Sequence, residues 1–169
     1  SSPFGTSCVV RGSMIVVGAP GDPVDTNDLQ GAAYVFVRNG AGWEERQRLS
    51  AKNGESRSAF GRDIALSGDI LVVGANGTVG GSIDRGSAVI YARISDDNWI
   101  EQAMLLAPDG APGDRFGWSV GVLGGTIMIG APSNDLMAVD GLGSAYVFTN
   151  SGSGWLLEQQ LWPPSLGVD

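Results

Sequence analysis

The six residues 115–120, RFGWSV, decide the fold, because their Phe-Gly pair precedes an apolar run and recurs along the chain. The pair stands at residues 4–5, 60–61 and 116–117, at intervals of 56 residues. A fixed period of this length is typical of repeat architectures. Other features keep the same interval: the Gly-Ala segments at 18–19, 74–75 and 130–131, the tryptophans Trp43, Trp99 and Trp155, and the leucines Leu49, Leu105 and Leu161. We therefore identify three copies of one unit, over about residues 4–59, 60–115 and 116–169.

Each copy predicts four short strands joined by turns. From the Phe-Gly pair, a first strand leads through a Gly-containing turn to a continuous apolar run such as ILVVGA at 70–75, which suits a strand covered on both faces. After a variable loop come a third strand, such as GSAVIYAR at 86–93, and a last strand, such as WEERQRL at 43–49, which mixes charged and apolar residues as an edge strand does. We expect an all-β protein, a single β-propeller segment over residues 1–169 with three four-stranded antiparallel blades.

The composition supports this fold class and excludes several functions. The 27 glycines and 8 prolines suit short strands and many turns. The net charge of −8 argues against nucleic acid and anionic membranes as partners, and no apolar run is long enough for membrane insertion. The absence of histidine removes the commonest general base and the commonest transition-metal ligand.

The motif order resembles the FG-GAP repeat, the blade unit of the integrin α-subunit propeller and of many bacterial and algal surface proteins. The likeness lies in Phe-Gly at 116–117, Gly-Ala-Pro at 130–132 and GSAYVF at 143–148, and the linker DGAPGDRFGWSV at 109–120 is most similar to the non-integrin branch. The resemblance implies an adhesion role and an extracellular or cell-surface location.

One feature of the integrin-type blade is missing. Those blades carry an Asp-rich calcium loop between the Phe-Gly strand and the Gly-Ala-Pro strand, where this chain has only short turns such as residues 67–69 (SGD). We therefore carry over no calcium site and predict no cofactor, although calcium bound elsewhere stays possible.

The number of blades predicts a further assembly. Known propellers close with about four to eight blades, so three would leave two uncovered sides. The next Phe-Gly pair would fall just beyond residue 169, so we expect either a piece of a longer propeller or a half-ring. We favour a homodimer that completes a six-bladed ring.

The loops after the Gly-Ala strand provide the candidate recognition surface. They differ most between copies, as binding loops on a rigid scaffold do, and the resemblance implies ligand binding at this face. Solvated turn residues are the alternative interpretation. The candidate ligand-binding residues are Asp22, Asp25, Asp28, Asp84, Asp135 and Asp140 in the loops and Trp118, which breaks the repeat, near the central channel.

Four other residues could carry chemistry. Asp109 and Asp114 in a linker are either turn residues or a cation site. Asn76 starts an Asn-Gly-Thr glycosylation pattern, which is also common by chance. Cys8 aligns with apolar residues, and no histidine could activate it, so we expect a small buried side chain and not a nucleophile.

We predict a non-catalytic binding or adhesion module that recognises a protein or glycan partner. One alternative is a structural blade segment of a large extracellular assembly. The other is a propeller hydrolase or lyase, for which Asp63 with Asp69 would be the carboxylate pair. Because Asp63 aligns with serines in the other copies, such a site would be confined to one blade. The recurring tryptophans should pack one blade on its neighbour.

Overall fold

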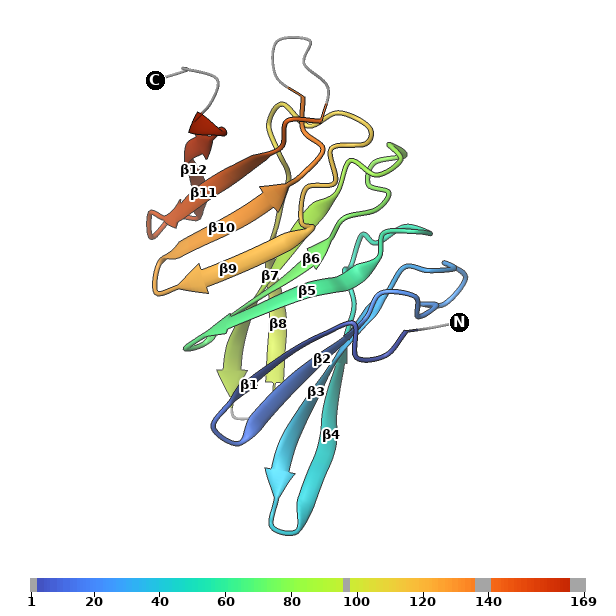
Figure 1. The fold of residues 1–169 in the computed structure, drawn as a ribbon. Coiled ribbons are helices and arrows are strands. Elements are labelled where there is room, and N and C mark those ends of the chain that lie inside the picture. Colours follow the sequence, from blue (N-terminus) through green and yellow to red (C-terminus); the bar gives the residue numbers. More distant parts are fainter. Residues whose placement is uncertain (1–2, 96–97, 136–140, 165–169) are drawn as a thin grey trace.

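The computed structural model describes residues 3–95, 98–135 and 141–164, which form three four-stranded antiparallel sheets, each in chain order (Figure 1). Sheet 1 contains β1 (Ser7–Arg11), β2 (Met14–Ala19), β3 (Ala32–Asn39) and β4 (Gly42–Leu49). Sheet 2 contains β5 (Phe60–Ser67), β6 (Ile70–Ala75), β7 (Ser87–Ser95) and β8 (Asn98–Leu105). Sheet 3 contains β9 (Ser119–Leu123), β10 (Thr126–Ala131), β11 (Ser144–Asn150) and β12 (Trp155–Leu161). The predicted all-β class and the three four-stranded antiparallel sheets are confirmed.

The three sheets repeat one another in local detail. The turn between the first two strands has a positive-φ glycine in each sheet, Gly12, Gly68 or Gly124. The pairing of the third and fourth strands shifts register at one equivalent place per sheet, between residues 35 and 36, 90 and 91, and 147 and 148. Such bulges increase the twist of a strand pair, so the outer part of every sheet bends in the same way.

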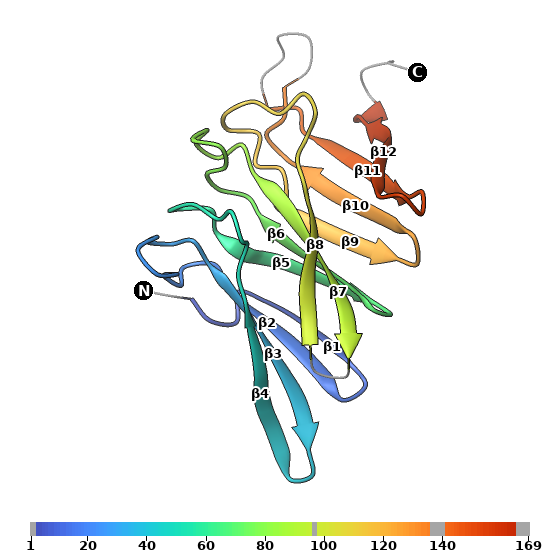
Figure 2. The same cartoon turned by 180° about the vertical axis from the view of Figure 1, so that it is seen from behind.

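The sheets lie face to face as successive blades do. The first strand of sheet 2, β5, contacts both β1 and β9, and each sheet extends outward from its first strand to its last strand, β4, β8 or β12 (Figures 1 and 2). This arrangement is consistent with propeller blades, whose inner strands crowd round an axis. The three sheets by themselves do not close a ring.

Two apolar cores fill the two spaces between the sheets. The first lies between sheets 1 and 2 and the second between sheets 2 and 3. Sheet 2 is therefore covered on both faces, and β6 is buried along nearly its whole length. Sheets 1 and 3 each keep one uncovered face, so the equivalent strand β10 alternates between buried Ile127 and Ile129 and exposed Thr126 and Met128.

The expectation that Cys8 is buried was wrong, because its side chain is exposed. Along β1, the Ser7 hydroxyl reaches sheet 2, donating to the carbonyl oxygen of Gly61 at 2.9 Å. Neighbouring strand residues point to opposite faces, so Cys8 points to the uncovered face of sheet 1. Its counterpart Ile64 is buried because sheet 1 covers that face of sheet 2.

Within the described residues, the structure contains no helix long and apolar enough to cross a bilayer.

Candidate functional site: the loop end and the joints beneath it

The Phe-Gly pair is the joint between neighbouring sheets. The Phe60 amide donates to the carbonyl oxygen of Gln30 in sheet 1 (2.8 Å), and its fully buried ring contacts Tyr91 of its own sheet edge-on. At the next joint, the Phe116 amide donates to the Arg85 carbonyl oxygen (3.1 Å). The ring fills the space between two sheets, which explains why the pair stands at or just before the start of each inner strand.

The glycine of the pair permits the close approach. Gly61 and Gly117 have φ values of 93° and 85°, a region that favours glycine. A Cβ on Gly61 would stand 2.5 Å from the Ala32 carbonyl oxygen, and one on Gly117 would stand 2.0 Å from that of Ser87. Any other residue would force the sheets apart.

Above these joints, the loops 20–31, 76–86 and 132–143 leave the same end of the three sheets, opposite the hairpin turns (Figure 1). We call this surface the loop end. Hydrogen bonds to the linker 50–59, between sheets 1 and 2, hold two of the loops. The Gln30 amide donates to the Ala51 carbonyl oxygen (3.0 Å), and the Glu55 carboxylate accepts the amides of Gly80 (2.6 Å) and Gly81 (3.0 Å). These two loops are therefore held in place by the chain's own contacts.

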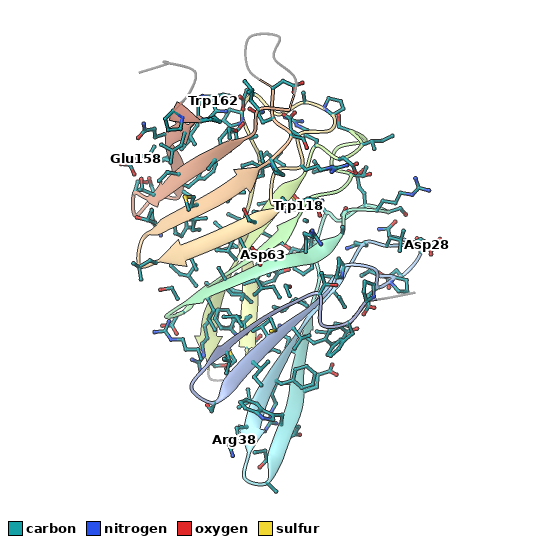
Figure 3. All side chains as sticks on the ribbon, viewed as in Figure 1. Asp28, Arg38, Asp63, Trp118, Glu158 and Trp162 are labelled. Atoms are coloured by element: carbon teal, nitrogen blue, oxygen red, sulfur yellow. The ribbon has the colours of Figure 1, made fainter. Side chains whose placement is uncertain are left out.

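The predicted aspartates that the structure describes lie at the loop end but not in one cluster. The Asp25 and Asp28 side chains are exposed and accept no hydrogen bond within the described part of the chain (Figure 3 labels Asp28). The Asp22 carboxylate accepts the Tyr34 hydroxyl. Asp84 pairs with Arg115 at 3.9 Å, and Asp135 accepts the Gly141 amide at 2.6 Å. Asp140 lies outside the described residues.

The sequence did not lead us to predict that two arginines of the linkers lie at the loop end. Arg57 and Arg115 reach the loop end because their amides donate to the carbonyl oxygens of Asp28 and Asp84, both at 2.8 Å. Both arginines are exposed, so the surface carries positive charge among its carboxylates. Their place shortly before a Phe-Gly pair was the available signal, since that segment crosses from one sheet to the next.

The two linker aspartates have internal partners. Asp109 accepts the Tyr146 hydroxyl (2.7 Å) and the Gln160 amide (3.0 Å), and burial together with this bond raises the pKa of Tyr146. Buried Asp114 accepts the Ala111 amide (2.7 Å) and the Asn134 amide (2.9 Å). Both carboxylates therefore hold the linker in place.

Within the described ranges, no three carboxylate or thiol side chains lie together in a way that could hold a metal ion. The cation site at the two linker aspartates stays a prediction.

Trp118 stands beside β9 and contacts cations from two directions (Figure 3). The Arg62 guanidinium lies 4.0 Å from its ring centroid and that of Arg115 lies 5.7 Å away. Cation–π contacts of this kind orient the indole. About a third of the residue is exposed, so part of the ring is free to meet another molecule.

The carboxylates of the hydrolase alternative are not together. Asp63 accepts the amides of Ile64 (3.0 Å) and Val120 (2.8 Å), which ties sheet 2 to sheet 3. Asp69 lies beyond the other end of β5, in a hairpin turn, within 4.0 Å of Arg93. The structure therefore gives Asp63 a structural partner and no acid/base partner at Asp69.

The remaining predicted residues have mixed surroundings. Asn76 is half-buried, and its Oδ1 atom is buried without a hydrogen-bond partner. Trp99 is buried in the core between sheets 1 and 2, and Trp155 packs against the core between sheets 2 and 3, as predicted. Trp43 is exposed and stacks on Arg38 at 5.9 Å, because no sheet covers its face.

Repeated four-stranded sheets with glycine joints and variable loops at one end define a blade-repeat β protein. The family model of the FG-GAP repeat matches residues 43–91 and 99–148, more than half of the chain. The chain belongs to the FG-GAP repeat family. Each match runs from the last strand of one sheet to the third strand of the next, so the family unit spans a joint. No curated protein matches the chain.

Proposed function

We propose that this chain is a non-catalytic binding or adhesion module that recognises a protein or glycan partner through its loop end. The observation that supports it most is that three loops of different sequence leave equivalent places on three repeated sheets. Variable loops on a rigid scaffold are the usual construction of a recognition surface. The hydrogen bonds to the linker 50–59 already order two of these loops, so the loops lose less conformational entropy when a partner binds.

The exposed charges indicate the chemistry of the partner. The carboxylates of Asp25 and Asp28 face solvent without an internal partner in the described structure. A basic protein surface, or the hydroxyl groups of a glycan, would give them hydrogen bonds, and those bonds are stronger when the donor is charged. We therefore propose a partner whose contact surface carries cationic or hydroxyl donors.

Location and assembly belong to the same proposal. We propose that the protein acts outside the cell or at its surface, as its resemblance to integrin-type propellers implies. We also propose that the sheets are successive blades of a ring, completed by a homodimer of six blades.

A glycan and protein array tests this function. The first step is to find a binder of the wild-type chain. The second compares the double variant Asp25→Asn/Asp28→Asn with Asp69→Asn, an exposed carboxylate at the opposite end. Asparagine tolerates the φ of 51° at residue 25, so the fold should be kept.

We expect the double variant to bind about three- to tenfold more weakly and the control to bind as wild type does. Equal losses in both variants, or a chain that binds nothing on either array, would contradict the proposal.

A further inference from the structure

We infer that the uncovered face of sheet 3 is the docking site for the Phe4-Gly5 pair of a second copy of this chain. The contact would repeat the joint that connects the sheets within the chain. The inference rests on the proposed blade arrangement and is independent of what the loop end binds.

A groove of about 500 Å³ opens on sheet 3. Its walls include Gly130, Ala131, Gly143, Ala145 and Leu161, which correspond in sheet 2 to Gly74, Ala75, Gly86, Ala88 and Leu105. In sheet 2 these positions pack against the next Phe-Gly pair, and Leu105 is 7% exposed. In sheet 3 the same leucine position is 40% exposed. The groove is therefore a joint with one side missing.

The glycine that precedes the third strand of each sheet shows the same difference between sheet 3 and the other two sheets. A Cβ on Gly31 or Gly86 would stand 2.1 Å or 1.9 Å from the carbonyl oxygen of Phe60 or Phe116 in the next sheet. At Gly143, the three atoms nearest to such a Cβ all belong to Pro132 of its own loop, the closest at 2.9 Å, and none to another sheet. Its φ of 73° resembles the 90° and 83° of the other two. The backbone of sheet 3 thus has the joint conformation without the joint contact.

The other half of such a joint is exposed on sheet 1. The Phe4 ring is 58% exposed, whereas Phe60 and Phe116 are fully buried. Gly5 has the φ of a joint glycine, 88°, and a Cβ there would meet no atom within 4 Å. Cys8 and Val10 lie on the same uncovered face.

The backbone partners for the contact are also present. Leu142 corresponds to Gln30 and Arg85, whose carbonyl oxygens accept the amides of Phe60 and Phe116, so its own carbonyl oxygen is placed to accept the Phe4 amide. Ser119 corresponds to Ser7, whose hydroxyl donates to Gly61 across a joint.

Pro3, which precedes Phe4, differs from the residues that precede the phenylalanines of the two joints within the chain. Ala59 and Arg115 precede the buried phenylalanines with φ values of 56° and 59° and donate their amides to the preceding sheet. Pro3 can adopt neither that φ nor that bond. The predicted correspondence therefore starts at Phe4.

We take a second copy as the occupant because this chain carries both halves of the joint, the Phe-Gly half on sheet 1 and the groove on sheet 3. Two copies that exchange these faces about a two-fold axis make two equal joints. Their six sheets then fall within the range of about four to eight blades that closes a ring.

Three variants test the contact, together with the wild-type chain. Phe4→Ala removes the exposed ring, and Ala145→Arg fills the groove. Because neither residue is buried in the single chain, both variants should fold. Ile100→Ala is the control, an apolar side chain of similar exposure (47%) on the middle sheet. Circular dichroism verifies folding of each.

Light scattering over a wide concentration range gives the mass, and the reaction of Cys8 with a thiol reagent gives its accessibility. We expect the mass of the wild type and of Ile100→Ala to rise from 17.4 kDa to twice that value, with Cys8 becoming protected as dimer forms. Phe4→Ala and Ala145→Arg should each weaken association at least about thirtyfold. An equal mixture of these two variants should associate better than either alone, because one intact joint remains.

A chain that stays monomeric throughout would overturn the inference. So would a dimer in which Cys8 reacts as fast as in the monomer, or one that Phe4→Ala leaves unchanged. Array binding by monomeric Phe4→Ala would leave the loop-end function intact, so the two proposals can fail separately.

Discussion

Gly18 in sheet 1 lies so close to Gly61 in sheet 2 that a Cβ at residue 18 would stand 2.1 Å from the Gly61 carbonyl oxygen. Gly74 and Gly117 repeat the contact between sheets 2 and 3, again at 2.1 Å. The glycine of Gly-Ala and the glycine of Phe-Gly are therefore the two sides of one joint. This explains why the motifs occur together at a fixed spacing.

Gly74→Ala should destabilise the fold by about 1–3 kcal/mol, because the added methyl group forces sheets 2 and 3 apart. The matched control is Gly121→Ala in β9, where a Cβ would meet no atom within 4 Å and φ is not positive. Urea denaturation gives both free energies of unfolding. Equal losses of folding free energy at the two positions would contradict a close contact between Gly74 and sheet 3.

Phe116→Ala should cost about 3–5 kcal/mol of folding free energy, since it empties the fully buried space between two sheets. Phe4→Ala should cost less than about 1 kcal/mol in the monomer, because that ring is mostly exposed. Thermal or urea unfolding at low protein concentration measures both changes. Similar costs would mean that the two rings have the same surroundings in solution.

Gln47 bridges sheets 1 and 2 at their outer edge. Its side-chain amide donates to the Trp99 carbonyl oxygen and its carbonyl accepts the Trp99 amide, both at 2.8 Å. Gln47→Ala should cost about 1–3 kcal/mol because the backbone groups of buried Trp99 lose their partner. Gln159→Ala is the control, at the equivalent place in sheet 3 with no sheet beyond it. Denaturant unfolding gives the free energy of unfolding of both variants. If Gln159→Ala lost as much stability as Gln47→Ala, the bridge between sheets 1 and 2 would be refuted.

Stability should fall above pH 10. Burial, and then the negative charge of Glu101, raise the pKa of Tyr91 above its ordinary value of 10.0. The unfolded chain therefore loses this proton first, so the stabilisation is complete below pH 10 and is lost as the pH rises toward the folded pKa.

The test compares the wild type with Tyr91→Phe in urea between pH 8 and the onset of alkaline unfolding. The wild-type free energy of unfolding should fall more steeply above pH 10, by up to about 1.4 kcal/mol per pH unit for this group. Tyr91→Phe should also lower stability at neutral pH, because the hydroxyl donates to the Ser50 carbonyl oxygen (2.8 Å). Identical slopes would show that Tyr91 ionises freely in the folded protein.

The repeat made much of the fold predictable. The period of the Phe-Gly pair located all twelve described strands, because each copy carries its own turn glycines and apolar runs. The role of Phe-Gly was predictable too, since a large ring followed by a glycine suits a close contact between sheets.

The environment of single residues was less predictable, because equivalent positions meet different neighbours. Cys8 is exposed and Ile64 is buried only because sheet 2 has a sheet on both sides. Asp63 bonds to the Val120 amide across a joint, a contact that no pattern within one copy reveals. The loop end was predicted as a surface from its variable sequence, but the linker arginines that share it depend on how the chain crosses between sheets.

Amide hydrogen exchange of the monomeric chain, resolved at single residues, tests the joint most directly. The account predicts that the Phe60 and Phe116 amides, which donate across the two joints, exchange only on global unfolding, while the Phe4 amide exchanges orders of magnitude faster. Rapid exchange at Phe60 and Phe116, at the rate of the hairpin turns, would contradict the claim that the Phe-Gly pair joins the sheets.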